Sequence, residues 1–184
     1  GTAGIGKAMA DIMASAGANV IARSRSNGCD IAREDDVKQA ISQAWRELGQ
    51  LDVVVNAAGL LRTARLEAQS SQDIADQINI NLLGAAWIAK WSHAPLKETR
   101  GTLLQFASSS YTRGRADHVV YAATKAAIVN MTQGLSEEWA ADGIRVSCIV
   151  PGRTDTEMRR TNFKGEAQDS LSNPYQVALG AARA

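Results

Sequence analysis

Apolar residues follow two patterns along the chain, short continuous runs and longer segments in which they recur at helical spacing. The continuous runs are typical of buried strands and lie at residues 19–22, 51–56, 102–106 and 145–150. The helical spacing predicts helices over residues 5–16, 34–48, 71–91 and 121–141. Strands that alternate with helices in this way form parallel sheets covered on both faces. We therefore predict an α/β fold with a doubly wound parallel sheet of the Rossmann type.

Turn-forming residues mark the ends of these elements. Gly17 and Gly49 follow the first two predicted helices and are expected to end them. Ser71 can cap the third helix, and Pro95 is expected to stop it soon after residue 91. The segment beyond residue 152 is polar, and one further helix is predicted after Asn173-Pro174.

Length and composition fit one globular domain over residues 1–184. The chain is 45% hydrophobic and 21% charged, and 20 basic residues nearly balance 19 acidic ones, so that its net charge is +1. This balance gives no reason to expect a nucleic acid or an anionic membrane as a partner. No apolar run approaches the roughly 20 residues that span a bilayer, and no segment resembles a signal peptide.

The cysteines and histidines give no sign of a metal site. Cys29 and Cys148 have no metal-ligand spacing, and Cys148 lies in an apolar run where a small buried thiol is expected. His93 and His118 have no partner at metal-ligand spacing, and we interpret both as surface or rim residues. Unpaired thiols suit a reducing compartment, so we expect a cytoplasmic location. Because no residues have metal-ligand spacing, we expect no metal cofactor.

Tyr121 and Lys125 are the first candidates for chemistry, because they lie one helical turn apart. A nearby ammonium favours the phenolate and lowers the pKa of the phenol, which can then exchange a proton with a substrate oxygen near neutral pH. The same spacing is common on ordinary helix faces. The pair alone therefore does not establish a catalytic site.

A second candidate is Gly4-Ile5-Gly6 at the start of the first predicted helix. Backbone N–H groups there could approach a phosphate at the positive end of the helix dipole, although a plain tight turn would have the same sequence. Asn56, Ser108 and Pro151 each follow a predicted strand, at the edge where ligands bind in such sheets. The fold would therefore gather them at one site.

These segments occur in order with others, as Gly4-Ile5-Gly6, Asp30-Ile31, Asn56-Ala57-Ala58-Gly59, Asn81-Leu82-Leu83-Gly84, Ser108-Ser109-Ser110, Tyr121-x-x-x-Lys125, and Pro151-Gly152 with Thr156. In this combination the chain resembles the short-chain dehydrogenase/reductase family over essentially its whole length. The resemblance implies an NAD(P)-dependent oxidoreductase that interconverts a carbonyl and a secondary alcohol. It also implies that the first and last strands of the sheet lie outside residues 1–184.

The resemblance gives each catalytic position a role. Tyr121 would be the general acid/base, and Lys125 would lower its pKa and hold the nicotinamide ribose. Ser108, 13 residues before the tyrosine, would polarise the carbonyl, although Ser109 and Ser110 are alternatives. The residue types support the same mechanism independently of the resemblance. A carbonyl oxygen that accepts a hydride gains negative charge and then a proton, and a hydroxyl and a phenol can supply the hydrogen bond and the proton.

The remaining implied positions surround the cofactor. Asn81 would interrupt its helix and support a proton-relay water, the alternative being an ordinary buried polar residue. Asp30 would hydrogen-bond the adenine. The positions implied in cofactor binding are Gly1, Gly4, Ile5, Gly6, Ser24, Arg25, Asp30, Ile31, Asn56, Ala57, Gly59, Tyr121, Lys125, Pro151, Gly152 and Thr156.

The choice of cofactor can be argued from charge at residues 22–26. An acid at this place suits the 2′-hydroxyl of NAD, whereas an arginine suits the 2′-phosphate of NADP. Here the chain has Arg23, Ser24, Arg25 and Ser26 but no acid. Arg25 could clamp a phosphate, the alternative being a solvated basic loop. We therefore favour NADP(H) over NAD(H).

The substrate is less constrained. Arg113 and Arg115 follow the serines and would suit a phosphate or carboxylate on the substrate, unless they face solvent. Residues 108–115 and 153–163 are also similar to one subgroup, the reductase domains attached to bacterial cytidylyltransferases, which reduce ribulose 5-phosphate for CDP-ribitol synthesis. Gly152 departs from the glutamate expected in that subgroup. We predict reduction of a small polar ketose, with a phosphorylated one as the specific hypothesis.

Two other functions are compatible with the fold. A dinucleotide-binding sensor or scaffold would lack catalysis, but it would not need the complete catalytic set. Dehydration or epimerisation would need further acid/base groups, which the sequence does not identify. Members of the family often form tetramers through two long helices, and Trp87, Trp91 and Trp139 on these helices fit either such an interface or core packing. We expect a homo-oligomer, either a dimer or a tetramer.

Overall fold

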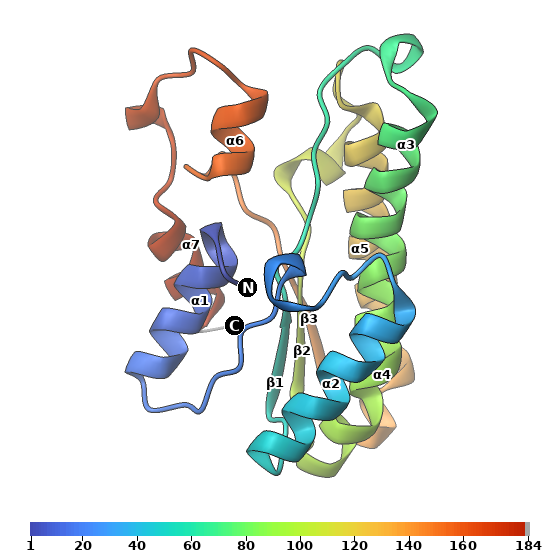
Figure 1. The fold of residues 1–184 in the computed structure, drawn as a ribbon, viewed down its shortest axis with the longest axis vertical. Helices are drawn as coiled ribbons and strands as arrows, with labels where there is room; N and C mark the ends of the chain where they lie inside the picture. Colours follow the sequence, from blue (N-terminus) through green and yellow to red (C-terminus); the bar gives the residue numbers. More distant parts are fainter. Residues whose placement is uncertain (183–184) are drawn as a thin grey trace.

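The computed structural model describes residues 1–182, which are built around a parallel sheet of three strands (Figure 1). The strands are β1 (Val53–Asn56), β2 (Thr102–Phe106) and β3 (Arg145–Ile149), in the spatial order β1-β2-β3. Val53 is paired with Thr102, and Leu103 with Val146. All three carboxyl ends therefore meet at one edge of the sheet.

Helices cover both faces of this sheet. They are α1 (Gly4–Ser15), α2 (Glu34–Leu48), α3 (Ser71–Ile78), α4 (Gly84–Thr99), α5 (Val119–Glu138), α6 (Glu157–Asn162) and α7 (Pro174–Ala181). In Figure 1, α1 and α7 lie on one side of the strands, and α4 and α5 lie on the other with α2 packed against α4. This arrangement confirms the predicted doubly wound α/β fold.

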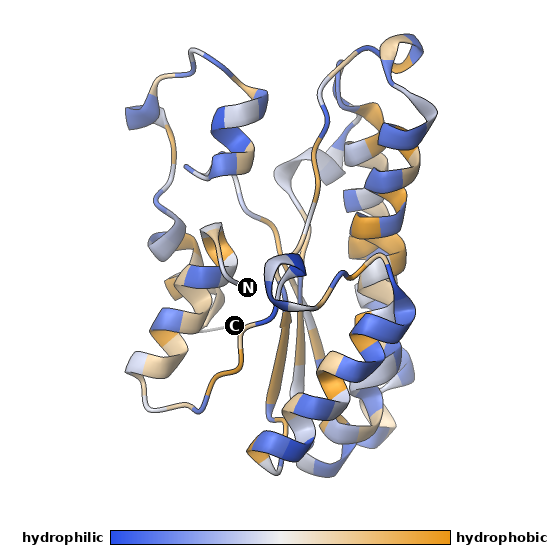
Figure 2. Cartoon of the chain, viewed as in Figure 1, coloured by the Kyte–Doolittle hydropathy of each residue, from blue (hydrophilic) through white to orange (hydrophobic). Residues whose placement is uncertain are grey.

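The two-residue period of a strand places core clusters on both faces of the sheet. Leu103 packs with Leu96 and Val146 on the α4 side, and the next residue, Leu104, packs with Met9 on the α1 side. Figure 2 shows the apolar strands enclosed between helices of mixed character. Strands that are apolar on both faces are expected when helices cover both faces, so the continuous runs in the sequence have a direct structural cause.

The tryptophans on the long helices belong largely to the first cluster. Trp139 is buried, and Trp87 and Trp91 are half-buried and pack against the same core. Core packing therefore accounts for Trp139. The predicted homo-oligomer stays a prediction.

The predicted strand at residues 19–22 is wrong. The segment has no regular secondary structure and no hydrogen-bonded strand partner among residues 1–182, and Val20 is exposed. Sheet formation requires a neighbouring ladder as well as an apolar run.

The helix predicted over residues 71–91 differs in three ways. A π-helical turn, Asn79–Leu83, separates α3 from α4. Ser70, not Ser71, caps α3, because its hydroxyl accepts a hydrogen bond from the backbone N–H of Asp73 at 3.0 Å. Pro95 lies inside α4, which continues to Thr99. The loss of one backbone hydrogen bond at Pro95 is tolerated because the proline and Leu96 are buried in the core.

A close approach at the start of α4 supports the loop that contains Asp30. A Cβ on Gly84 would lie 2.8 Å from the backbone oxygen and two side-chain carbons of Ile31. At this distance Ile31 would have to move to make room for the Cβ. Because one of the contacting atoms is a backbone oxygen, the loop that contains Ile31 would have to shift with it. Glycine at this position therefore lets Ile31, and with it Asp30, rest directly on the helix.

We expect Gly84→Ala to lower the free energy of unfolding by about 1–3 kcal/mol, because the new methyl group overlaps Ile31. The matched control is Gly134→Ala in the exposed part of α5, where no atom lies within 4 Å of an added Cβ. The control should raise stability by about 0.5–1 kcal/mol, because alanine favours the helix. Chemical denaturation measures both variants, and equal effects would contradict the assigned contact.

Candidate active site

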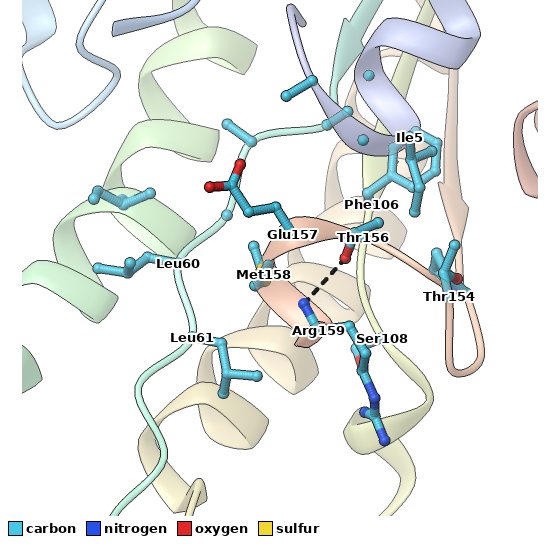
Figure 3. Close-up of a pocket in the computed structure, with 18 of the residues that line it drawn as sticks. Ile5, Leu60, Leu61, Phe106, Ser108, Thr154, Thr156, Glu157, Met158 and Arg159 are labelled. Carbon is cyan, nitrogen blue, oxygen red and sulfur yellow. Dashed lines mark hydrogen bonds between the residues drawn. The ribbon is translucent and has the colours of Figure 1, made fainter. Parts of the chain in front are cut away.

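A cleft of about 680 Å³ opens at the carboxyl ends of the strands. The start of α1, residues 23–31, the segments that follow β1, β2 and β3, and the first turn of α5 line it, and α6 closes one wall (Figure 3). Most positions singled out in the sequence lie on this cleft, namely Gly1, Gly4, Ile5, Gly6, Ser24, Arg25, Asp30, Ile31, Ala57, Gly59, Ser108, Tyr121, Lys125, Pro151, Gly152 and Thr156. The topology therefore brings these distant segments together as predicted.

The glycine segment forms an open helix N-terminus on the cleft. Gly4 has φ of +52°, a left-handed conformation that favours glycine. A Cβ on Gly6 would lie 3.0 Å from Gly1 Cα and 3.3 Å from Ala57 Cβ, so only glycine allows α1 to start this close to the segment after β1. No side chain caps α1, and its first turn carries no acidic residue. Its free N–H groups fit the phosphates of a dinucleotide.

Ser108 and Tyr121 face the same cleft from different elements. Ser108 follows β2, and its hydroxyl accepts a hydrogen bond from the backbone N–H of Ser110 at 3.2 Å. Tyr121 lies in the first turn of α5. Burial raises the pKa of the Tyr121 phenol, and interactions with the Ser108 hydroxyl and the Arg159 guanidinium offset part of this rise. The pair therefore presents two hydroxyl groups to one side of the cleft.

Lys125 lies behind Tyr121 as a buried cation. Its side chain is 4% exposed, and its Nζ donates a hydrogen bond to the backbone oxygen of Phe106 at 2.8 Å. Nζ lies 5.7 Å from the centre of the Tyr121 ring. Burial lowers the pKa of Lys125 to about 8.

The predicted effect of Lys125 on the phenol needs correction. Arg159 is the cation that lowers the pKa of Tyr121 here, and burial outweighs it, so that the pKa lies above its ordinary value. The spacing of Tyr121 and Lys125 is visible in the sequence, but the depth at which the pair is buried is not. In this structure the phenol therefore holds its proton at neutral pH.

Asn81 lies in the π-helical turn, so the helix is interrupted where the sequence suggested. Its side-chain oxygen accepts from Leu60 N at 2.7 Å, and its amide donates to Leu60 O at 2.8 Å and to Thr124 Oγ1 at 3.1 Å. Asn81 is 1% exposed and does not line the cleft, and a Cβ on Gly59 would lie 3.4 Å from its oxygen. It therefore positions the segment after β1 rather than facing the cleft.

Asn56 also lies off the cleft wall, contrary to the prediction. Its amide donates to Gln105 Oε1 at 2.8 Å, and its oxygen accepts from Ala58 N at 3.2 Å. Asn56 thus joins the ends of β1 and β2 and shapes the turn that brings Ala57 and Gly59 to the cleft. Its polar side chain is buried, which explains why it needs both partners.

The basic segment at residues 23–26 forms one end of the cleft. Arg23 pairs with Glu47 at 3.6 Å, whereas Arg25 is exposed and makes no ion pair with any residue between 1 and 182. Thr2 Oγ1 donates to Ser24 Oγ at 2.9 Å, and the Ser24 and Ser26 hydroxyls lie 2.8 Å apart. One cation and a group of hydroxyls are therefore available there to an oxyanion.

Arg113 and Arg115 do not line the cleft. Arg113 is exposed and Arg115 half-buried. Besides Arg23 and Arg25, the cleft is lined by Arg159, a residue to which the sequence assigned no role in the site. Figure 3 shows its side chain extending toward Ser108 from α6, whose N-terminus is capped by Thr156 through a 3.2 Å hydrogen bond to Arg159 N. A threonine three residues before the arginine was the only available signal for this helix.

Two aromatic residues complete that wall. His118 packs edge-to-face against Tyr121 and Phe163, with ring centres 6.5 and 6.0 Å away. Burial, together with Arg115 and Arg159, lowers the pKa of His118. His118 thus lies at the rim, as expected, but it contacts the residues that form the site.

No cluster of histidine, cysteine and acidic residues among residues 1–182 has the arrangement of a metal site. Over the same residues, none of the helices is long and apolar enough to cross a bilayer.

Comparisons with known proteins agree with this geometry. A family model described as short chain dehydrogenase matches residues 26–167. The chain is 37% identical over 179 residues to the bifunctional ribulose 5-phosphate reductase/CDP-ribitol pyrophosphorylase Bcs1 of Haemophilus influenzae, which confirms the predicted likeness to that subgroup. The match covers 97% of this chain but 38% of that relative.

Two similar solved structures have a TM-score of 0.88. A 3-ketoacyl-(acyl-carrier-protein) reductase from Brucella melitensis in complex with NADH is 26% identical, and the match covers 98% of this chain and 85% of that one. A short chain dehydrogenase from Burkholderia cenocepacia in complex with NADP is 27% identical, with coverages of 99% and 86%. The family model spans more than half of the residues, and the chain therefore belongs to the short-chain dehydrogenase/reductase family.

Proposed function

We propose that this protein is an oxidoreductase that uses NADP(H) to reduce the carbonyl group of a small, polar, phosphorylated ketose. The observation that carries this proposal is the convergence of Ser108 and Tyr121 on one cleft with an uncapped, glycine-rich helix N-terminus. The 37% identity to a protein named for ribulose 5-phosphate reduction supports the substrate class.

Ser108 and Tyr121 have different roles at the carbonyl oxygen of the substrate. The bound nicotinamide supplies the hydride. Ser108 donates a hydrogen bond to the carbonyl oxygen as it gains negative charge, and Tyr121 delivers the proton. The raised pKa of Tyr121 keeps the phenol protonated, which suits an acid acting in the direction of reduction. Lys125, charged below its pKa of about 8 and buried behind Tyr121, would hold the nicotinamide ribose.

Other residues would hold the cofactor. The free N–H groups at the start of α1 suit the pyrophosphate. Arg25 and the Ser24 hydroxyl suit the 2′-phosphate of NADP, because the cation has no acidic partner among the described residues. Asp30 lines the same cleft and would contact the adenine, and Gly152 and Thr156 would line the nicotinamide side.

Tyr121→Phe should reduce turnover by about 10²–10⁴-fold, because it removes the proton donor. NADPH should still bind, as measured by the fluorescence of the bound cofactor. The control is Tyr111→Phe, since Tyr111 is exposed and does not line the cleft. Full turnover in Tyr121→Phe would overturn the acid/base assignment. Tight cofactor binding without turnover of any carbonyl by the unmodified protein would favour a sensor or scaffold.

Arg25→Asp should weaken NADPH relative to NADH by about 10–100-fold, because a charge-assisted hydrogen bond to phosphate is worth about 1.5–3 kcal/mol. The ratio of kcat/KM for the two cofactors measures this change. Arg46→Asp, on the exposed side of α2, alters the net charge equally and should leave the ratio unchanged. An unchanged ratio in Arg25→Asp would mean that Arg25 does not contact the cofactor.

The buried charge of Lys125 should make stability depend on pH. Its pKa is lowered from 10.5 to about 8 on folding, so between these values the unfolded chain binds a proton that the folded protein does not. The free energy of unfolding should therefore rise with pH from about 8 to 10.5, by about 3 kcal/mol. Below pH 8 this contribution is constant.

Lys125→Met isolates this effect. The lost hydrogen bond to Phe106 adds a difference that does not depend on pH. We therefore expect the stability of the unmodified protein, relative to Lys125→Met, to increase between pH 8 and 10.5, as measured by urea denaturation at each pH. A constant difference would show that Lys125 titrates normally in the folded protein.

A further inference from the structure

The wall of the cleft that α6 forms contains a cation that the proposed proton transfer does not use. Arg159 lies near the end of α6, lines the cleft, and its side chain is 22% exposed. Its charge influences the pKa of both Tyr121 and His118, so it lies electrostatically close to the reacting phenol. A half-buried guanidinium beside the proposed proton donor needs an explanation.

Arg159 is held in one orientation by several contacts. Its Nε and Nη2 donate to the two carboxylate oxygens of Glu166 at 2.6 and 2.7 Å. Its guanidinium stacks on Phe163, 3.8 Å from the ring centre. Thr63 Oγ1 lies 3.3 Å from the side-chain oxygen of Asn162 and ties the end of α6 to the segment after β1. The guanidinium is therefore fixed before any ligand binds.

Glu166 does not neutralise the local positive charge. The same carboxylate also accepts from Arg153 Nη1 at 3.2 Å, so one anion faces two cations. The next arginine, Arg160, is paired separately with Asp155. The cluster of Arg153, Arg159 and Glu166 therefore keeps one net positive charge.

Arg159 also keeps free donors. Of its five N–H groups, Glu166 takes one on Nε and one on Nη2, and Nη1 makes no hydrogen bond to any residue between 1 and 182. Phe163, on which the guanidinium stacks, packs edge-to-face against His118, so one face of the guanidinium is covered by an aromatic ring. A fixed cation with unused, coplanar donors is the arrangement that binds an oxyanion through two hydrogen bonds.

We propose that Arg159 recognises the phosphate of the substrate and so selects phosphorylated over uncharged ketoses. This inference rests on the proposed function, because it assumes that the carbonyl is reduced between Ser108 and Tyr121. Arg113 and Arg115, which follow the serines in the sequence, do not line the cleft. Glu166 orients the guanidinium and, because it is shared with Arg153, leaves the charge available.

The test compares ribulose 5-phosphate with ribulose as substrates of the whole protein, following NADPH oxidation. Arg159→Met should lower the ratio of kcat/KM for the phosphorylated over the unphosphorylated ketose by about 10–100-fold, mainly through KM. Arg159→Gln, which keeps a donor toward Glu166, is the second variant and should show the same loss. Circular dichroism and thermal melting check that each variant is folded.

Arg160→Met is the matched control. Arg160 is the next residue on α6, but it is exposed, pairs with Asp155 and does not line the cleft, so the substrate ratio should stay within about 3-fold of the unmodified protein. An unchanged ratio in folded Arg159 variants would overturn the inference, as would an equal change in Arg160→Met.

A binding measurement separates this inference from the proposed function. If the unmodified protein reduces neither ketose, the proposed function fails. Calorimetric titration of the NADPH-loaded protein with ribulose 5-phosphate then decides the inference. Binding that weakens about 10–100-fold in Arg159→Met would support anion recognition by Arg159. No binding to the unmodified protein, or equal binding to both, would overturn it.

Discussion

The burial of one ammonium group sets the arrangement of three elements. Lys125 is 4% exposed, and its hydrogen bond to the Phe106 backbone oxygen joins α5 to the carboxyl end of β2. A buried charge is costly unless it is paired or hydrogen-bonded, so this contact restricts where the helix can lie. The segment after β1 approaches the same group at Gly59, where an added Cβ would lie 3.5 Å from Nζ. Tyr121, one turn earlier on α5, is thereby placed over the cleft.

A second polar layer supports the first and explains an irregular helix. The π-helical turn between α3 and α4 directs the Asn81 side chain to both backbone groups of Leu60 and to Thr124 on α5. Buried polar groups need such partners, and a regular helix would not present the amide in the same direction. The Asn81 side chain and the buried Lys125 therefore have the same structural effect, because each brings α5 close to the segment after β1.

The parts of the site that directly follow the strands could be predicted from the sequence. The apolar runs stop near Asn56, Phe106 and Ile149, so the segments that follow them could be expected at one edge. Arg159 could not be found in this way, because α6 has six residues and no apolar period. Its direction depends on long-range contacts, among them the bridge between Thr154 and Ser172. The pKa of Tyr121 was likewise inaccessible, since its direction depends on burial.

The overall charge of the protein does not explain how it would attract an anion. The net charge is +1, so no overall field attracts an anion. Within the cleft, however, Arg25, Arg159 and the uncapped N-terminus of α1 all line one cavity. A ligand with several anionic groups could therefore contact more than one positive feature at once. In the proposed function, a phosphorylated dinucleotide would contact Arg25 and α1, and Arg159 would be left to the substrate.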